Sequence, residues 1–210
     1  MAKVILFDFD GTIADSFNSF LEILDVLSDK YHLNKIPPGE LNAFRSEDAK
    51  TLLRKLKIPI YKIPFIARDM KRLQREKMLK IKPFKNLPEV LLELKKMGFE
   101  LGILTSNGRE NVSEFLKLNN INVFEYIYDN ASLFGKERTI NRFVKNQNIQ
   151  KNNLIYVGDE IRDIFASKKA GIKIISVSWG FNSRVGLEKN NPDFLVDNPN
   201  EIIPVIKSLN

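Results

Sequence analysis

Residues Val4–Thr12 have the sequence VILFDFDGT, in which four apolar residues run directly into Asp-Phe-Asp and a glycine. An unbroken apolar run of this kind is typical of a strand that is buried on both faces of a parallel sheet. Gly11 lets the backbone turn sharply after it. Ligands of such sheets bind beyond the carboxyl ends of the strands, where Asp8 and Asp10 could hold a divalent cation. A plain Asp-Gly turn at a strand end is the alternative that this stretch alone leaves open.

The bulk composition fits one folded domain, or a core domain with a smaller insertion. The 210 residues are 43% hydrophobic, which is enough for a real core at this length. No apolar run approaches the ~20 residues that span a bilayer. The N-terminal residues lead straight into the first expected strand, so we expect no signal peptide and no membrane partner. The absence of cysteine excludes disulfides and thiolate chemistry and fits a cytoplasmic location.

The charge of the chain suggests anionic partners, because its formal net charge is +7. Phosphorylated metabolites and nucleic acids both belong to this class. Residues 62–82 contain eight lysines and arginines but only two acidic residues, Asp69 and Glu76. Aromatic residues are not interleaved with them as in a platform that stacks nucleic-acid bases. A solvated helix face is the plainer interpretation, so we do not expect a nucleic-acid partner.

The first third of the chain after the Asp-x-Asp turn is predicted to be helical. Apolar residues recur at helical spacing over 14–30, over 40–56 with an interruption near 46–47, and over 66–80. Prolines separate these segments, and no part of 15–82 alternates like a strand. We therefore expect an all-helical insertion over 15–82 and a core formed by 1–14 and 83–210.

The remainder of the chain alternates strands and helices. Apolar strands are expected over 99–104, 123–128, 154–157, 174–177 and 194–196. Helices are expected over 87–97, 109–118, 137–146 and 201–209, and another carries on to 170 after the polar stretch at 158–163. This alternation predicts an α/β fold whose mainly parallel, doubly wound sheet carries helices on both sides. Right-handed crossovers then place all the strand-end loops at one edge of the sheet.

Polar residues concentrate at the expected strand ends. Asp159 follows a strand, and Asp163 lies one helical turn later on the same face. An acidic residue at this position can simply complement the helix dipole, which would explain one of these residues. It would not explain a cluster that faces the Asp-x-Asp pair at 8–10. Magnesium prefers a few carboxylates together with waters and phosphate oxygens. We expect Asp8, the backbone carbonyl of Asp10 and Asp159 to supply that set, with Asp163 acting through water or holding Asp159 or Lys136.

Other strand-end residues fit a phosphate, although each has a plainer interpretation. Residues 105–107 (Thr-Ser-Asn) end a strand and precede a helix, so they could cradle a phosphate or simply cap that helix. Lys136 follows a strand-end loop and would offset crowded negative charge, although one surface lysine is unremarkable. Trp179 is expected to pack or to wall the pocket, and His32 is expected to be structural.

Taken in order, these residues resemble the four motifs of the haloacid dehalogenase (HAD) superfamily. The motifs correspond to DFDGT at 8–12, the threonine that ends LGILT at 101–105, Lys136, and GDEIRD at 158–163. The helical insertion resembles the cap of the phosphoglycolate phosphatase-like subgroup, as do ADSF at 14–17 and VSWG at 177–180. The resemblance covers nearly the whole chain. The second motif departs from the pattern by one extra polar residue, Ser106.

The resemblance implies a Rossmann-like core with a helical cap and a Mg²⁺-dependent phosphatase of small phosphomonoesters, either monomeric or homodimeric. It implies these site residues: catalytic Asp8 (nucleophile), Asp10 (general acid and base) and Lys136; phosphate-binding Gly11, Thr12, Thr105, Ser106, Asn107 and Lys136; and metal-binding Asp8, Asp10, Asp159 and Asp163. A phosphomutase, or a non-enzymatic module that binds nucleic acid or protein, are the alternatives. A dehalogenase would not need Asp10.

Overall fold

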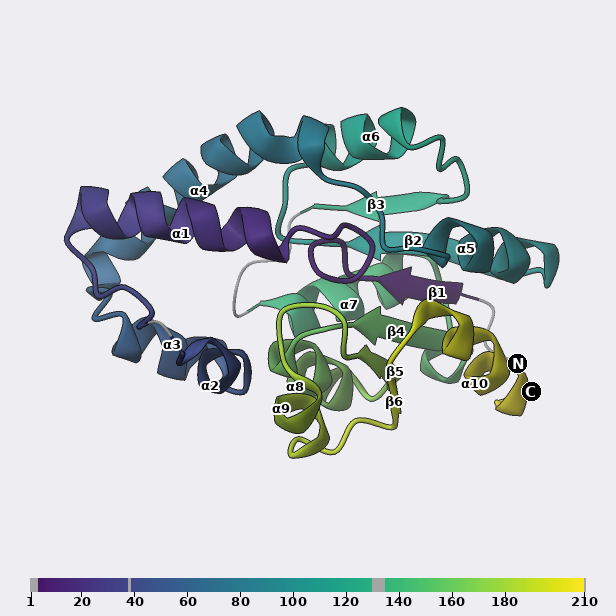
Figure 1. Ribbon diagram of the computed structural model, residues 1–210. Helices are drawn as coiled ribbons and strands as arrows, with labels where there is room; N and C mark the ends of the chain where they lie inside the picture. Colours follow the sequence, from purple (N-terminus) through teal and green to yellow (C-terminus); the bar gives the residue numbers. More distant parts are fainter. Residues whose placement is uncertain (1–3, 38, 130–134, 210) are drawn as a thin grey trace.

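The computed structural model describes residues 4–37, 39–129 and 135–209. Its centre is a parallel sheet with the strand order β3-β2-β1-β4-β5-β6 (Figure 1). The strands are β1 (Val4–Phe7), β2 (Glu100–Leu104), β3 (Tyr126–Tyr128), β4 (Leu154–Gly158), β5 (Lys173–Val177) and β6 (Phe194–Val196). The parallel sheet predicted from the sequence is confirmed.

Strand β1 lies in the middle of the sheet and is buried on both faces. Leu6 pairs with Gly102 of β2 on one side and with Tyr156 of β4 on the other. Ile5 and Phe7 point into one hydrophobic core, whereas Val4 and Leu6 point into the core on the opposite face. The uninterrupted apolar sequence of this strand therefore follows from its two buried faces.

Helices cover both faces of the sheet. One face is covered by α5 (Leu87–Lys96), α6 (Arg109–Leu118) and α10 (Ile202–Ser208), and the other by α7 (Lys136–Asn146), α8 (Ile161–Ala170) and α9 (Arg184–Glu188). Short 3₁₀ turns precede β4 (η3, Lys151–Asn153) and α10 (η4, Pro199–Glu201). The predicted doubly wound arrangement is confirmed. Helix α9 was not expected, because its five residues are too few for a periodic pattern.

The segment between β1 and α5 contains helices and no strand among its described residues, as predicted. They are α1 (Phe17–Tyr31), α2 (Leu41–Arg45), α3 (Ala49–Lys55), η1 (Ile60–Lys62), α4 (Ile63–Lys77) and η2 (Met78–Lys80). The interruption expected near 46–47 separates α2 from α3, and the Asp48 side chain caps α3 by accepting from the Thr51 N–H at 2.8 Å. We call residues 15–82 the cap.

The cap has a small core of its own. Apolar side chains of α1 and α4 pack together, including Ile23, Leu27 and Ile66. His32 ends α1 in a left-handed backbone conformation, which is a structural role. At the junction with the sheet domain, the two connections run side by side: the Asp15 N–H donates to the Lys82 carbonyl at 2.9 Å. This pairing supports domain boundaries near 14 and 83, which stay a prediction.

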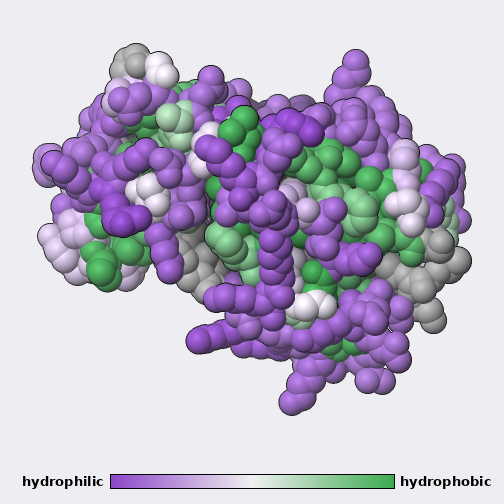
Figure 2. All heavy atoms as spheres, turned by 90° about the horizontal axis from the view of Figure 1, so that it is seen from below, coloured by the Kyte–Doolittle hydropathy of each residue, from purple (hydrophilic) through white to green (hydrophobic). Residues whose placement is uncertain are grey.

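Cap and sheet domain are arranged so that the strands point toward the cap. In Figure 1 the arrowheads of β1 and β4 face the side on which α1–α4 lie. On the face shown in Figure 2, hydrophilic side chains cover most of the surface, and apolar side chains gather in patches between them. Across residues 4–37, 39–129 and 135–209, no helix has both the length and the apolar character needed to cross a membrane.

Candidate active site

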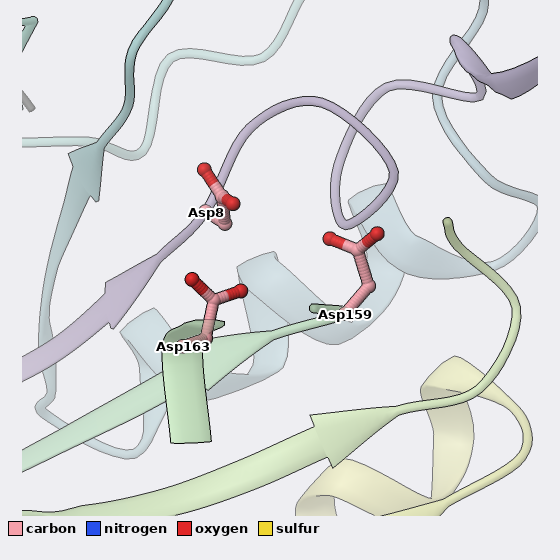
Figure 3. A group of neighbouring side chains, drawn as sticks. All are labelled: Asp8, Asp159 and Asp163. Atoms are coloured by element: carbon pink, nitrogen blue, oxygen red, sulfur yellow. The ribbon is translucent and has the colours of Figure 1, made fainter. Parts of the chain in front are cut away.

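Three aspartates converge at the carboxyl end of the sheet. Asp8 follows β1, Asp159 follows β4, and Asp163 lies in the first turn of α8. One carboxylate oxygen from each lies within 4.8 Å of the other two, and Figure 3 shows the three side chains around one shared space. All three are buried. The predicted convergence of these residues therefore follows from the adjacency of β1 and β4 and the turn into α8.

Local hydrogen bonds fix two of these aspartates. The Asp8 N–H donates to the Val157 carbonyl at 2.8 Å, which extends the pairing of β1 with β4, and Asp8 Oδ1 accepts from the Phe9 N–H at 2.8 Å. In α8, Asp163 Oδ2 accepts from the Glu160 N–H at 3.1 Å as part of a capping box. Asp163 therefore caps α8 through Oδ2, in addition to the complementation of the helix dipole considered from the sequence, and its Oδ1 is directed at the site.

Lys136 lies between two of the aspartates. Its Nζ donates to Asp8 Oδ2 at 2.7 Å and to Asp163 Oδ1 at 2.5 Å. Burial alone would lower the pKa of this ammonium, but the negative charges of Asp163 and Asp8 outweigh it, and the pKa is raised. Lys136 is therefore a permanent positive charge inside the site. The contact agrees with one of the alternatives stated from the sequence, that Asp163 holds Lys136 in place.

The acidic cluster carries more negative charge than Lys136 can offset. Burial, followed by the charges of Glu160, Asp8 and Asp163, raises the pKa of Asp159 well above its usual value. Burial raises the pKa of Asp163 to about 6, despite the neighbouring Lys136. A divalent cation would relieve this repulsion, and a set of carboxylate oxygens is the ligand chemistry that Mg²⁺ prefers. The residues present therefore fit a metal ion.

Asp10 is held apart from that cluster. Its Oδ2 accepts a hydrogen bond from Asn107 Nδ2 at 3.0 Å, and its carboxyl is not among the three that converge. The surrounding protein raises the pKa of Asp10 to about 6, mainly through burial; Asn107 opposes this rise and Asp8 adds to it. Such a carboxyl exchanges its proton near neutral pH, as a general acid and base must. Metal binding through the Asp10 carbonyl stays a prediction.

The segment at residues 105–107 lies next to Asp10. Thr105 Oγ1 accepts from the Asn107 N–H at 3.0 Å, and Asn107 Oδ1 accepts from the Gly108 N–H at 2.8 Å. Thr105 and Asn107 are buried, whereas Ser106 is half-buried. The N-cap position of α6 belongs to Gly108, so the interpretation of 105–107 as an ordinary N-cap is wrong. Phosphate binding by these three residues stays a prediction.

Gly11 and Thr12 surround Asp159. Thr12 Oγ1 donates to Asp159 Oδ1 at 2.6 Å. Gly11 has a φ of +76°, and a Cβ at this position would lie 2.2 Å from Asp159 Oδ2, so only glycine fits. The first motif therefore orients the Asp159 carboxylate as well as supplying Asp8 and Asp10. Contact of Gly11 and Thr12 with phosphate stays a prediction.

The segment after β5 contains Trp179, which packs as expected, and also supplies contacts to Asp159 and Ile161 that were not expected. The Phe181 N–H donates to Asp159 Oδ2 at 2.7 Å, and Asn182 Oδ1 accepts from the Ile161 N–H at 2.8 Å. Trp179 packs against Phe84 and also donates from Nε1 to the Thr12 carbonyl at 3.2 Å. One signal for these contacts was available in the sequence. The segment follows the strand expected over 174–177, and the carboxyl ends of parallel strands lie at one edge of the sheet.

Comparisons with known proteins identify relatives that match nearly the whole chain. The family model described as haloacid dehalogenase-like hydrolase matches residues 5–177. A phosphoglycolate phosphatase from Synechococcus elongatus is 28% identical over 211 residues, covering 99% of this chain and 98% of that protein. The pyrophosphatase PpaX from Bacillus cereus is 24% identical over 217 residues, covering 99% and 98%.

Solved structures show the same fold at low sequence identity. A haloacid dehalogenase-like family hydrolase from Streptococcus pneumoniae superposes with a TM-score of 0.81 at 19% identity, covering 97% of this chain and 98% of that one. CbbY from Rhodobacter sphaeroides, solved in complex with phosphate, has a TM-score of 0.74 at 20% identity and covers 96% of both chains. The match to the family model spans most of the sequence, and the chain therefore belongs to the haloacid dehalogenase-like hydrolase family.

Proposed function

We propose that the protein is a magnesium-dependent phosphatase that hydrolyses a small phosphomonoester through an aspartyl-phosphate on Asp8. The observation that carries the proposal is the pairing of a buried Asp8, in contact with Lys136, with an Asp10 whose pKa is raised to about 6. In this proposal Asp8 acts as the nucleophile and Asp10 as the proton donor. The relative named phosphoglycolate phosphatase supports a phosphomonoester substrate, and the one named pyrophosphatase supports the broader class of small phosphorylated substrates.

In the first step, a carboxylate oxygen of Asp8 attacks the substrate phosphorus and the bond from phosphorus to the ester oxygen breaks. Asp10 donates its proton to the departing oxygen, so that an alcohol leaves. The positively charged ammonium of Lys136 stays in contact with Asp8 Oδ2. It reduces the repulsion between this carboxylate and the anionic substrate.

In the second step, a water molecule attacks the phosphorus of the aspartyl-phosphate. Asp10, now ionised, takes a proton from this water, and the bond from phosphorus to the Asp8 oxygen breaks. Inorganic phosphate leaves, Asp8 is a carboxylate again, and Asp10 is again protonated. A pKa of about 6 suits this exchange, because both protonation states of Asp10 are accessible near neutral pH.

The remaining site residues bind and orient. Asp8, Asp159 and Asp163, with the Asp10 carbonyl, would hold Mg²⁺, which when bound supplies positive charge against the phosphate oxygens. Gly11, Thr12, Thr105, Ser106 and Asn107 are proposed to bind those oxygens. The cap would exclude water and select the leaving group of a small phosphorylated metabolite. Cytoplasmic location and a monomeric or homodimeric state belong to the same proposal.

The test is release of inorganic phosphate from phosphoglycolate, sugar phosphates, pyrophosphate and p-nitrophenyl phosphate, with and without Mg²⁺. We expect Mg²⁺-dependent release by the wild type and its loss in Asp8→Asn, which keeps the side-chain volume but removes the nucleophile. Asp15→Asn, at an exposed position seven residues later, is the matched control and should retain activity. Release that survives in Asp8→Asn would contradict the mechanism. Phosphoryl transfer between sugar phosphates without release would favour the mutase.

A further inference from the structure

The cap contacts the sheet domain through a cation that rests on two consecutive carbonyls. Arg45, the last residue of α2, donates from Nε to the Phe181 carbonyl at 3.0 Å and from Nη2 to the Gly180 carbonyl at 2.6 Å. Its guanidinium also lies 4.8 Å from the centre of the Phe17 ring. A planar guanidinium engages the two carbonyls with two different nitrogens in a fixed geometry, whereas a lysine offers a single nitrogen.

In a second contact at the same junction, the donor belongs to the sheet domain and the acceptors belong to the cap. Asn182, which is buried, donates from Nδ2 to the carbonyls of Arg45 (2.7 Å) and Glu47 (3.0 Å) in the turn between α2 and α3. Its Oδ1 accepts from the Ile161 N–H at the start of α8. This residue therefore ties the cap turn to the helix that begins two residues after Asp159.

The core segment that receives Arg45 also holds Asp159. Phe181 accepts from Arg45 through its carbonyl and donates through its N–H to Asp159 Oδ2 at 2.7 Å. Gly180 packs so closely on the same carboxylate that a Cβ would lie 2.3 Å from Asp159 Oδ2. A shift of residues 180–182 therefore moves the hydrogen-bond donor that orients Asp159.

We propose that Arg45 is a positioning residue that couples the placement of the cap to metal binding at Asp159. This role rests on the metal site of the proposed function. Arg45 holds residues 180–182, and these hold the Asp159 carboxylate in the orientation that a cation needs. Because coupling free energies are reciprocal, Mg²⁺ should also stabilise the contact between cap and core.

The first measurement is Mg²⁺ affinity by calorimetry on the whole protein without substrate. We expect Arg45→Ala to bind Mg²⁺ about tenfold more weakly than the wild type, within the range typical of coupled sites. Arg45→Lys keeps the charge but loses the fork, so it should restore only part of the affinity. Arg54→Ala is the matched control, because this exposed arginine of α3 donates to Thr51 inside the cap.

The second measurement is the position of the cap. The chain has no cysteine, so two introduced cysteines can be spin-labelled without background. Tyr61→Cys on the cap and Lys169→Cys on α8 are both exposed. We expect Arg45→Ala to lengthen or broaden the label-to-label distance, and Mg²⁺ to shorten or narrow it in the wild type. Gly186→Ala provides a second route, since its Cβ would lie 2.8 Å from the Ser46 Cα and force the cap turn outward without removing Arg45.

The outcomes separate this inference from the proposed function. Weaker Mg²⁺ binding in both Arg45→Ala and Gly186→Ala, each folded by circular dichroism, supports the coupling even if no phosphomonoester is hydrolysed. Wild-type Mg²⁺ affinity in the two folded variants overturns it, whether or not the cap moves and however active the wild type is.

Discussion

Asp8 Oδ2 accepts a hydrogen bond from Lys136 Nζ at 2.7 Å, and each residue is only 3% exposed. The same ammonium bonds Asp163 Oδ1, so one buried cation neutralises part of two carboxylates that come from different elements. Since an unpaired buried charge is costly, the pair contributes to folding as well as to the placement of the nucleophile. Lys136 therefore links the stability of the sheet domain to the chemistry of its carboxyl edge.

Replacing Lys136 by methionine should lower the free energy of unfolding by about 3–5 kcal/mol in EDTA, because Asp8 and Asp163 then share no counter-charge. Saturating Mg²⁺ should recover part of this loss, since a cation that binds only the folded state stabilises it. Urea unfolding with EDTA and with Mg²⁺ measures both effects. Lys96→Met, at an exposed position of α5, is the control. An equal loss under the two conditions would show that the metal does not replace the lysine charge.

The alkaline limb of the pH profile should report the contact between Asn107 and Asp10. The hydrogen bond from Asn107 lowers the pKa of Asp10, which burial has raised to about 6. Asn107→Ala removes the lowering contribution, so the pKa should rise and the alkaline limb of kcat/KM should move to higher pH. Asp10 must be protonated to act as the acid, which fixes this direction. Asp10→Asn should lack the limb, and a shift to lower pH in Asn107→Ala would be inconsistent with the assignment.

Because of Asp10, the free energy of unfolding should also fall as the pH rises. Its pKa rises from 3.8 to about 6 on folding, so between these values the folded protein binds more protons than the unfolded chain. The stabilisation is complete below about pH 4 and is lost as the pH rises through about 6. In EDTA, wild type should lose on the order of 2 kcal/mol relative to Asp10→Asn over this range. Urea unfolding of both proteins at several pH values measures it; a difference independent of pH would contradict the shift.

The strand-end residues were predictable from the sequence because each carries a local signal. The apolar run of β1 identifies a central strand, and the rule that parallel strands end at one edge brings Asp8, Lys136 and Asp159 together without coordinates. The contacts of Arg45 were not predictable. Its partners lie 135 and 136 residues away and are backbone carbonyls. Every residue has a backbone carbonyl, so the sequence does not indicate which of them Arg45 contacts. The contacts of Asn182 were not predictable for the same reason. Helix α9 was not predicted because a helix of five residues is too short to show a periodic pattern of apolar residues.

Gly180→Ala should weaken Mg²⁺ binding about tenfold or more, because a Cβ would lie 2.3 Å from Asp159 Oδ2 and 2.3 Å from the Gly11 carbonyl oxygen. Both neighbours are fixed, one by Thr12 and Phe181 and the other by the turn after β1, so the carboxylate or the loop must move. Calorimetry with Mg²⁺ measures the change. Gly108→Ala is the control, since its Cβ would meet nothing within 4 Å. Undiminished affinity in Gly180→Ala would mean that Asp159 does not bind the metal from this orientation.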